Sequence, residues 1–159
     1  MIRSIFASAT ALVLFASSLS LFSEQTFSMI KPGAVQEHHI GAIIDAIEKA
    51  NLQIVKLQMM QLDEAQVKAF YKEHEGKPFF PTLITKMTSG PVVAMVIEGD
   101  NAVPRLREII GNTNPEKAAP GTIRALFGKN MTENAIHASD SADSAKREIA
   151  FFFKIPSPQ

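Results

Sequence analysis

The chain has 159 residues, no net charge and no cysteine. Its length fits one domain, and the lack of cysteine excludes a disulfide scaffold, cysteine-bound zinc, iron–sulfur clusters and thiol catalysis. The balance of 16 Lys+Arg against 16 Asp+Glu lacks the basic excess that usually marks nucleic-acid binding, so no nucleic acid is expected as a partner.

The first 23 residues differ from the rest of the chain. Their only ionisable side chain is Arg3, and residues 5–22 form an uncharged, largely apolar run that contains several small residues. This pattern resembles a secretory signal, but the run is also near the length of a short membrane span. A third interpretation places the true start of the protein downstream. We set residues 1–23 apart from the fold and expect one domain over residues 24–154, followed by a tail at 155–159.

From residue 24 onward, the apolar pattern changes repeatedly between strand and helix periods. Alternating or continuous apolar residues predict strands at 26–30, 55–59 and 92–97, and a short fourth strand at 134–137. Apolar residues at helical spacing predict helices at 40–49, 63–71 and 103–110, and a last helix through Ala145 and Ile149 that is capped by Asp140 or Ser141. The alternation of strands and helices predicts helices packed on a sheet.

The remaining segments read as irregular. Pro32-Gly33 is a predicted turn, and residues 79–87 are a short apolar segment between two breaks. Residues 111–122 contain two Gly, two Pro and two Asn and are expected to form a long ordered loop, which in a compact domain is usually functional. Residues 151–153, all Phe, are expected to tie the end of the chain to the core.

His137, at the end of the fourth predicted strand, is the main candidate for chemistry. Imidazole titrates near neutrality and can act as a nucleophile or as an acid or base without a cofactor. Glu148 flanks the buried face of the last helix, where a carboxylate needs a partner, and an imidazole N–H would serve. The alternatives are a structural histidine at a strand end and a glutamate paired within its own helix.

Basic and aromatic residues beside the predicted turn and loop form a second group of candidates. Guanidinium groups bind phosphate oxygens through two hydrogen bonds, which makes Arg107 and Arg124 candidate phosphate ligands together with Lys31. Taken alone, each cation is more often a solvated surface charge. Tyr71 and Phe79 bracket a Gly-Lys-Pro break, where an exposed ring can stack on a base, although both could also belong to the core.

Six segments, in order, resemble the nucleoside diphosphate kinase family across nearly all of residues 24–154. They are IKPGAV (30–35), GKPFF (76–80), TSGPVVAM (88–95), GNTNP (111–115), APGTIR (119–124) and NAIHASDS (134–141). The resemblance implies a ferredoxin-like α+β fold with a four-stranded antiparallel sheet and helices packed on it. It also implies ping-pong transfer of the γ-phosphoryl group of a nucleoside triphosphate, mainly ATP, to nucleoside diphosphates, which supplies NTPs and dNTPs.

The resemblance also implies roles for single residues. His137 matches the phosphorylated nucleophile, and Glu148 matches the carboxylate that orients it. Asn134, with Lys31, matches the contact to the sugar hydroxyl, and Phe79 and Leu83 match the apolar clamp on the base. The positions that hold the phosphates or lie beside the nucleophile are Lys31, Tyr71, Arg107, Thr113 and Arg124.

The family resemblance further implies a cofactor, an assembly and a location. Mg²⁺ is expected, held mainly by the nucleotide phosphates and not by protein side chains. The loop at 111–122 is expected to build subunit contacts in a homo-oligomer, either a tetramer or a hexamer. The cytoplasm is the expected location, and a membrane would be involved only if residues 1–23 are retained.

Three positions depart from the family pattern. Ala125-Leu126 follows Arg124 where Gly-Asp is usual, Glu133 replaces a frequent Arg, and Ala138 replaces the Gly after the nucleophile. The last change would restrict the backbone if the position needs a positive φ. These departures leave open a catalytically silent nucleotide-binding or scaffold protein on the same fold, whereas the intact set of matched site residues favours an active enzyme.

Overall fold

The structure is a computed structural model that describes residues 23–153. The signal, anchor and downstream-start interpretations of the N-terminal segment concern residues outside that range, and so does the expected tail at 155–159. Among the described residues, no helix combines the length and the apolar character needed to cross a membrane.

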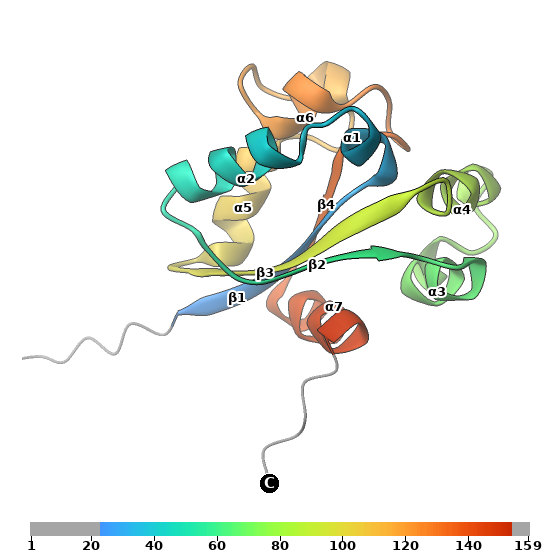
Figure 1. Ribbon diagram of the computed structural model, residues 1–159, viewed down its shortest axis with the longest axis horizontal. Helices are drawn as coiled ribbons and strands as arrows, with labels where there is room; N and C mark the ends of the chain where they lie inside the picture. Colours follow the sequence, from blue (N-terminus) through green and yellow to red (C-terminus); the bar gives the residue numbers. More distant parts are fainter. Residues whose placement is uncertain (1–22, 154–159) are drawn as a thin grey trace, which may run out of the picture.

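Four antiparallel strands form a sheet in the order β2-β3-β1-β4 (Figure 1). The strands are β1 (Glu24–Ile30), β2 (Gln53–Gln61), β3 (Pro91–Gly99) and β4 (Ile136–Ala138). β1 pairs along its whole length with β3 in the centre of the sheet. β4 pairs with the end of β1, where His137 lies opposite Met29. The predicted ferredoxin-like α+β class is confirmed.

Helices cover both faces of the sheet (Figure 1). The helices that pack on one face are α1 (Pro32–Gln36), α2 (Ile40–Lys49), α5 (Ala102–Ile110) and α6 (Ile123–Phe127). The helices on the other face are α3 (Glu64–Phe70), α4 (Phe80–Met87) and α7 (Ala142–Phe153). β3 alternates between the two layers, since Val93 and Met95 join the first core cluster whereas Val92 and Ala94 join the second. A strand buried on both faces reads as a continuous apolar run, as residues 92–97 do.

Most predicted elements are present, with shifted ends. The helices expected at 40–49, 63–71, 103–110 and after residue 140 are α2, α3, α5 and α7. Ser141 caps α7, because its Oγ accepts a hydrogen bond from the Ser144 backbone N–H at 3.1 Å. The three C-terminal Phe residues form the last turn of α7, and Phe152 stacks on Phe27 with the ring centroids 4.8 Å apart, as an apolar tie-down should.

Three short helices replace segments for which the sequence predicted no helix. α1 begins at Pro32, where a turn was predicted, because proline at the first helical position already has the required φ. α4 occupies the apolar segment before Thr88, and α6 follows the loop at 111–122. That loop also contains a 3₁₀ turn, η2 (Pro115–Lys117), and another such turn, η1 (Lys72–His74), follows α3.

Candidate active site

A cavity of about 430 Å³ brings together every residue for which the sequence predicted a role in catalysis or nucleotide binding. These residues are Lys31, Tyr71, Phe79, Leu83, Arg107, Thr113, Arg124, Asn134, His137 and Glu148. Further lining residues, to which the sequence assigned no such role, are Glu73, His74, Met131, Thr132, Ala138, Asp140 and Ser144. The cavity is therefore assembled from segments that span most of the described chain.

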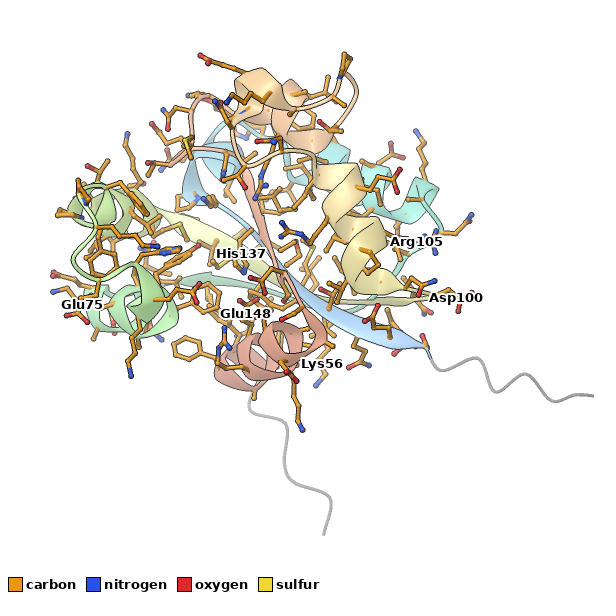
Figure 2. The ribbon with its side chains drawn as sticks, turned by 180° about the vertical axis from the view of Figure 1, so that it is seen from behind. Lys56, Glu75, Asp100, Arg105, His137 and Glu148 are labelled. Carbon is orange, nitrogen blue, oxygen red and sulfur yellow. The ribbon has the colours of Figure 1, made fainter. Side chains whose placement is uncertain are left out.

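His137 and Glu148 form the centre of this cavity. β4 carries His137 and α7 carries Glu148, and the two side chains point toward one another (Figure 2). Nε2 of His137 lies 2.9 Å from Oε2 of Glu148, and Ser139 Oγ donates to the same oxygen at 2.7 Å. With Nε2–H donating to the carboxylate, Nδ1 keeps a lone pair and can act as a nucleophile.

Three aromatic side chains pack against the His137 ring. Phe70 meets the imidazole edge-on with the centroids 5.1 Å apart, and Tyr71 does so at 6.0 Å. Phe27 lies at 6.0 Å in a tilted arrangement. These contacts restrict rotation of the ring, so its direction is set by packing as well as by Glu148.

Lys31 connects the end of β1 to the loops around the cavity. Its Nζ donates to Asn134 Oδ1 at 2.7 Å and to the Thr132 carbonyl oxygen at 3.1 Å. Asn134 Nδ2 donates in turn to the Thr113 carbonyl oxygen at 3.0 Å. Burial, together with the nearby charge of Arg124, lowers the pKa of Lys31 from 10.5 to about 7. An anionic ligand beside this lysine would favour its protonated, positively charged form.

Arg124 and Tyr71 present buried polar atoms to the same cavity. Nη1 of Arg124 donates to the Gly111 carbonyl oxygen at 3.1 Å, and Nη2 donates to that of Ile136 at 3.0 Å. Among the described residues, Arg124 Nε and the Tyr71 hydroxyl are two of the three buried side-chain atoms that lack a hydrogen-bond partner. Unpaired buried donors beside a cavity indicate a place for a ligand.

The charge states of these two side chains favour an anion. Burial and, to a smaller extent, the charge of Arg107 lower the pKa of Arg124 to about 10. That pKa still leaves the guanidinium positive at neutral pH. Burial and the charge of Glu148 raise the pKa of Tyr71, so its hydroxyl stays neutral and can donate. Arg107 is exposed and adds a third cation, after Lys31 and Arg124, to the lining of the cavity.

The apolar part of the cavity lies around the start of α4. Phe79 is 43% exposed and Met131 is 62% exposed, whereas Leu83 is buried beneath them in the second core cluster. Exposed large apolar side chains in a cavity suit a flat, partly apolar ligand group. Met131 was missed because a single methionine in a polar loop carries no periodic signal.

A strained residue explains how Asn134 and His137 reach the same cavity. In a regular strand, residues three apart point to opposite faces. Ala135 has φ +67°, and the Ile136 N–H donates to the Asn134 carbonyl oxygen at 2.8 Å, which closes a tight turn. This turn delays the start of β4 relative to the predicted strand at 134–137. It also rotates Asn134 toward the side chain of His137.

The three departures from the family pattern leave the cations Lys31, Arg107 and Arg124 in the cavity lining. Ala138 is buried in β4 and is absent from the positive-φ residues of the described chain, so alanine fits there. Leu126 is 60% exposed on α6. Glu133 pairs with Lys86 at 3.1 Å and lines a second, smaller cavity of about 230 Å³. The negative charge of Glu133 is therefore paired with Lys86.

The described residues hold few candidate metal ligands in one place. Within residues 23–153, no three side chains of the His, Asp and Glu types are grouped closely enough to hold a metal ion. Two exposed carboxylates, Glu73 and Asp140, nevertheless line the large cavity. Their oxygen atoms fit Mg²⁺, which prefers oxygen ligands, keeps several waters and is commonly shared with substrate phosphates.

Comparison with known proteins gives one consistent family. The family profile for nucleoside diphosphate kinase matches residues 24–156. "Nucleoside diphosphate kinase 2" of Protochlamydia amoebophila (strain UWE25) is 55% identical over 131 residues, which cover 82% of this chain and 92% of that protein.

Solved structures agree with the sequence comparison. The nucleoside diphosphate kinase of Aquifex aeolicus is 45% identical with a TM-score of 0.79 and covers 82% of this chain and 95% of that chain. A halophilic nucleoside diphosphate kinase from Halobacterium salinarum, in complex with CDP, is 44% identical with a TM-score of 0.81, over 84% of this chain and 89% of that chain.

Proposed function

Because this chain belongs to the nucleoside diphosphate kinase family, it transfers the γ-phosphoryl group of a nucleoside triphosphate to a nucleoside diphosphate, and we propose that His137 carries that group between the two nucleotides. The observation that carries this proposal is the Nε2–Oε2 contact of 2.9 Å between His137 and Glu148 inside a cavity lined by Lys31, Arg107 and Arg124. We further propose that residues 24–154 form the catalytic domain.

The first half of the reaction forms a phosphohistidine. The lone pair of His137 Nδ1 attacks the γ-phosphorus, an N–P bond forms, and the bond from that phosphorus to the β,γ-bridging oxygen breaks with its electrons on the departing nucleoside diphosphate. Nε2 keeps its proton, and the carboxylate of Glu148 stabilises the positive charge that develops on the ring. Ser139 holds that carboxylate in place.

The second half of the reaction regenerates the histidine. A β-phosphate oxygen of the second nucleoside diphosphate attacks the phosphorus, and the N–P bond breaks with its electron pair returning to Nδ1. No external base is required, because the attacking phosphate oxygen is already anionic. The same groups therefore serve both halves of the ping-pong cycle, with ATP as the main donor.

The cations and the unpaired donors are proposed to hold the phosphates. Phosphoryl transfer depends on in-line positioning and on positive charge around the equatorial oxygens. Lys31, Arg107 and Arg124 provide that charge, and Tyr71 and Thr113 provide hydroxyl groups from the same lining.

The sugar and the base are proposed to occupy the opposite part of the cavity. The Lys31–Asn134 hydrogen bond places an ammonium and an amide together, which suits a sugar hydroxyl. Phe79, Leu83 and Met131 provide apolar surface for the base. Stacking without hydrogen bonds to the base edge tolerates every base, so similar activity is expected with purine and pyrimidine nucleotides.

Mg²⁺ is the proposed divalent cation. When bound, it neutralises charge on the nucleotide phosphates and favours departure of the leaving group. It would be held mainly by those phosphates, with Asp140 and Glu73 as the nearby carboxylates of the cavity. The contribution of the chain itself is to keep the phosphates oriented toward His137.

We propose that the protein is a homo-oligomer, a tetramer or hexamer, and that it works in the cytoplasm, where nucleoside triphosphates are abundant. β2 lies at an edge of the sheet, and its side chains Val55, Leu57 and Met59 are 37%, 50% and 53% exposed. An apolar edge strand of this kind is normally covered. A second copy of the chain would cover it.

A labelling experiment tests the proposed role of His137. Purified protein would be incubated with Mg²⁺ and γ-labelled ATP and then chased with unlabelled GDP. We expect acid-labile label on the protein that moves to GTP, and no label on His137→Ala. His74→Ala, which alters another histidine of the same cavity, should still be labelled. Nucleotide binding without labelled protein or GTP would instead favour a catalytically silent protein on the same fold.

A further inference from the structure

The proposed nucleotide cavity is enclosed by two segments that lie far apart in the sequence. Phe79 and Leu83 come from the start of α4, whereas Met131 and Thr132 come from the segment 128–134 that leads into β4. A nucleotide in the cavity would lie between these two walls. Whatever fixes the spacing of the walls therefore affects how tightly the nucleotide is held.

One ion pair joins the two walls. Lys86, in the last turn of α4, places its Nζ 3.1 Å from Oε1 of Glu133. Within the part of the chain that the structure describes, no other side-chain hydrogen bond or ion pair links α4 to the segment 128–134. The side chains are 44% and 26% exposed, so the pair is partly shielded from solvent and salt.

Glu133 is firmly attached to its own segment. Its other carboxylate oxygen accepts a hydrogen bond from Asn130 Nδ2 at 3.3 Å. Asn130 Oδ1 accepts hydrogen bonds from the backbone N–H groups of Thr132 and Glu133 at 3.0 and 2.9 Å, and the Lys129 N–H donates to the Glu133 carbonyl oxygen at 2.8 Å. The segment therefore forms a compact turn, and a shift of Glu133 also shifts Thr132 and the adjoining Asn134.

The ion pair lies beside the nucleotide cavity and not within it. Lys86 and Glu133 line the smaller cavity of about 230 Å³, which shares only Lys31 and Thr132 with the larger one. The contact with Lys86 also lowers the pKa of Glu133, which keeps the pair ionised at neutral pH. Neither side chain is placed to contact the reacting phosphates.

From these contacts we infer that Lys86 and Glu133 form a clasp, defined as this ion pair, that fixes the spacing between α4 and the segment 128–134 and so sets nucleotide affinity. The two residues are positioning residues, because they act through Leu83, Met131 and Asn134. The inference rests on the proposed function, since it takes the larger cavity as the nucleotide site.

Kinetics of full-chain variants test the clasp. Glu133→Gln keeps the size of the side chain and can still accept from Asn130, and Lys86→Met keeps an apolar stem of similar length. Each is expected to raise the KM for nucleoside diphosphates about fivefold and to change kcat by less than about twofold, in line with a partly shielded ion pair. The KM of the double variant should be no higher than that of either single variant.

Two further measurements separate a clasp from general loss of structure. The charge-swapped variant Lys86→Glu/Glu133→Lys is expected to restore the KM, and added NaCl should raise the KM of the unmodified protein more steeply than that of Glu133→Gln. Lys49→Met is the matched control, because it breaks the exposed Lys49–Asp45 pair of 2.7 Å on α2 and should leave the KM unchanged.

An unchanged KM in both single variants, a loss confined to kcat, or a swap that restores nothing would overturn the inference. Failure of the proposed function has a different signature, since the unmodified protein would then transfer no phosphoryl group. In that case calorimetric titration with ADP still tests the clasp. The Kd should rise about fivefold in Glu133→Gln, and equal affinity in the variant and the unmodified protein would refute the clasp.

Discussion

Burial of Lys31 lowers its pKa, and this shift affects both the stability of the protein and its binding of ligands. It is 8% exposed, and its pKa is lowered from 10.5 to about 7 by burial and by Arg124. Because the folded pKa lies below the unfolded value, the cost of burying the ammonium is present below pH 7. That cost is relieved as the pH rises from about 7 to 10.5, so the contribution of Lys31 makes stability increase with pH in this window.

A polyphosphate beside Lys31 should raise its pKa again, because opposite charge favours the protonated form. At pH 8 the free site is largely deprotonated at Lys31 and the bound site is protonated, so nucleotide binding is expected to take up about one proton. Uptake should approach zero at pH 6. Calorimetry of ADP binding in two buffers with different ionisation enthalpies measures the number of protons. Persistence of the uptake in Lys31→Met would show that another group is responsible.

Ser139 offers a second prediction at the scale of a single residue. Its Oγ donates to Glu148 Oε2 at 2.7 Å and accepts from the Phe27 N–H at 3.3 Å. Ser139→Ala should leave that buried N–H unpaired and lower the free energy of unfolding by about 1–2 kcal/mol. It should also slow phosphohistidine formation, because Glu148 loses a restraint. Urea unfolding and rapid-quench labelling measure the two effects. Ser89→Ala, which removes an exposed hydroxyl that donates to the Lys86 carbonyl oxygen at 2.8 Å, should change both far less.

At the scale of elements, α3 is stabilised by a reciprocal cap at its first turn. Asp63 Oδ1 accepts from the Gln66 N–H at 2.7 Å, and the Asp63 N–H donates to Gln66 Oε1 at 2.9 Å. Asp63→Ala is expected to lower the free energy of unfolding by about 1 kcal/mol, as measured by urea denaturation. Asp45→Ala, which removes only an exposed ion pair, should cost less than about 0.5 kcal/mol. An equal loss of unfolding free energy in the two variants would show that the Asp63 cap contributes no more than an exposed ion pair.

The elements that could be predicted from the sequence are those with a long, regular period or a clear cap. α2, α3 and α5 belong to this group. α4 was missed because breaks flank it and because Phe79 and Ile84 add apolar residues beside the helical set Phe80, Leu83 and Met87. α1 and α6 have only five residues each, which is too short for a 3.6-residue period to be visible.

The residues of the site could be predicted, but their arrangement could not. Segments that carry the family resemblance contain about half of the residues that line the cavity. The positive φ of Ala135 has no signal in the sequence, because alanine rarely adopts it. The partner of Glu133, Lys86, lies 47 positions earlier in the sequence and depends on how α4 packs. Long-range contacts of this kind follow from the tertiary fold and not from local pattern.

At the scale of the whole molecule, the ferredoxin-like sheet explains why one cavity can collect residues from the whole chain. β1 lies next to β4 although their sequences are more than 100 positions apart. This pairing brings Lys31, just after β1, close to Asn134 and His137. The same sheet leaves β2 at an edge with one neighbour, β3. One chain therefore brings together all the residues proposed for the site, whereas one edge of β2 has no neighbouring strand in the described residues.

The exposed apolar side chains of β2 lead to a prediction about assembly. Leu57 and Met59 are two positions apart, so they point to the same face of the strand, and half of each side chain is exposed. Leu57→Lys should place an ammonium in a contact between copies and weaken it, because an unpaired charge is costly to bury. Sedimentation velocity is expected to find a multiple of the single-chain mass for the unmodified protein and a shift toward one chain for the variant. Ala150→Lys, at an exposed position on α7, should leave the mass unchanged. If Leu57→Lys keeps the full assembled mass, the contact lies elsewhere, and the loop at 111–122 becomes the surface to mutate.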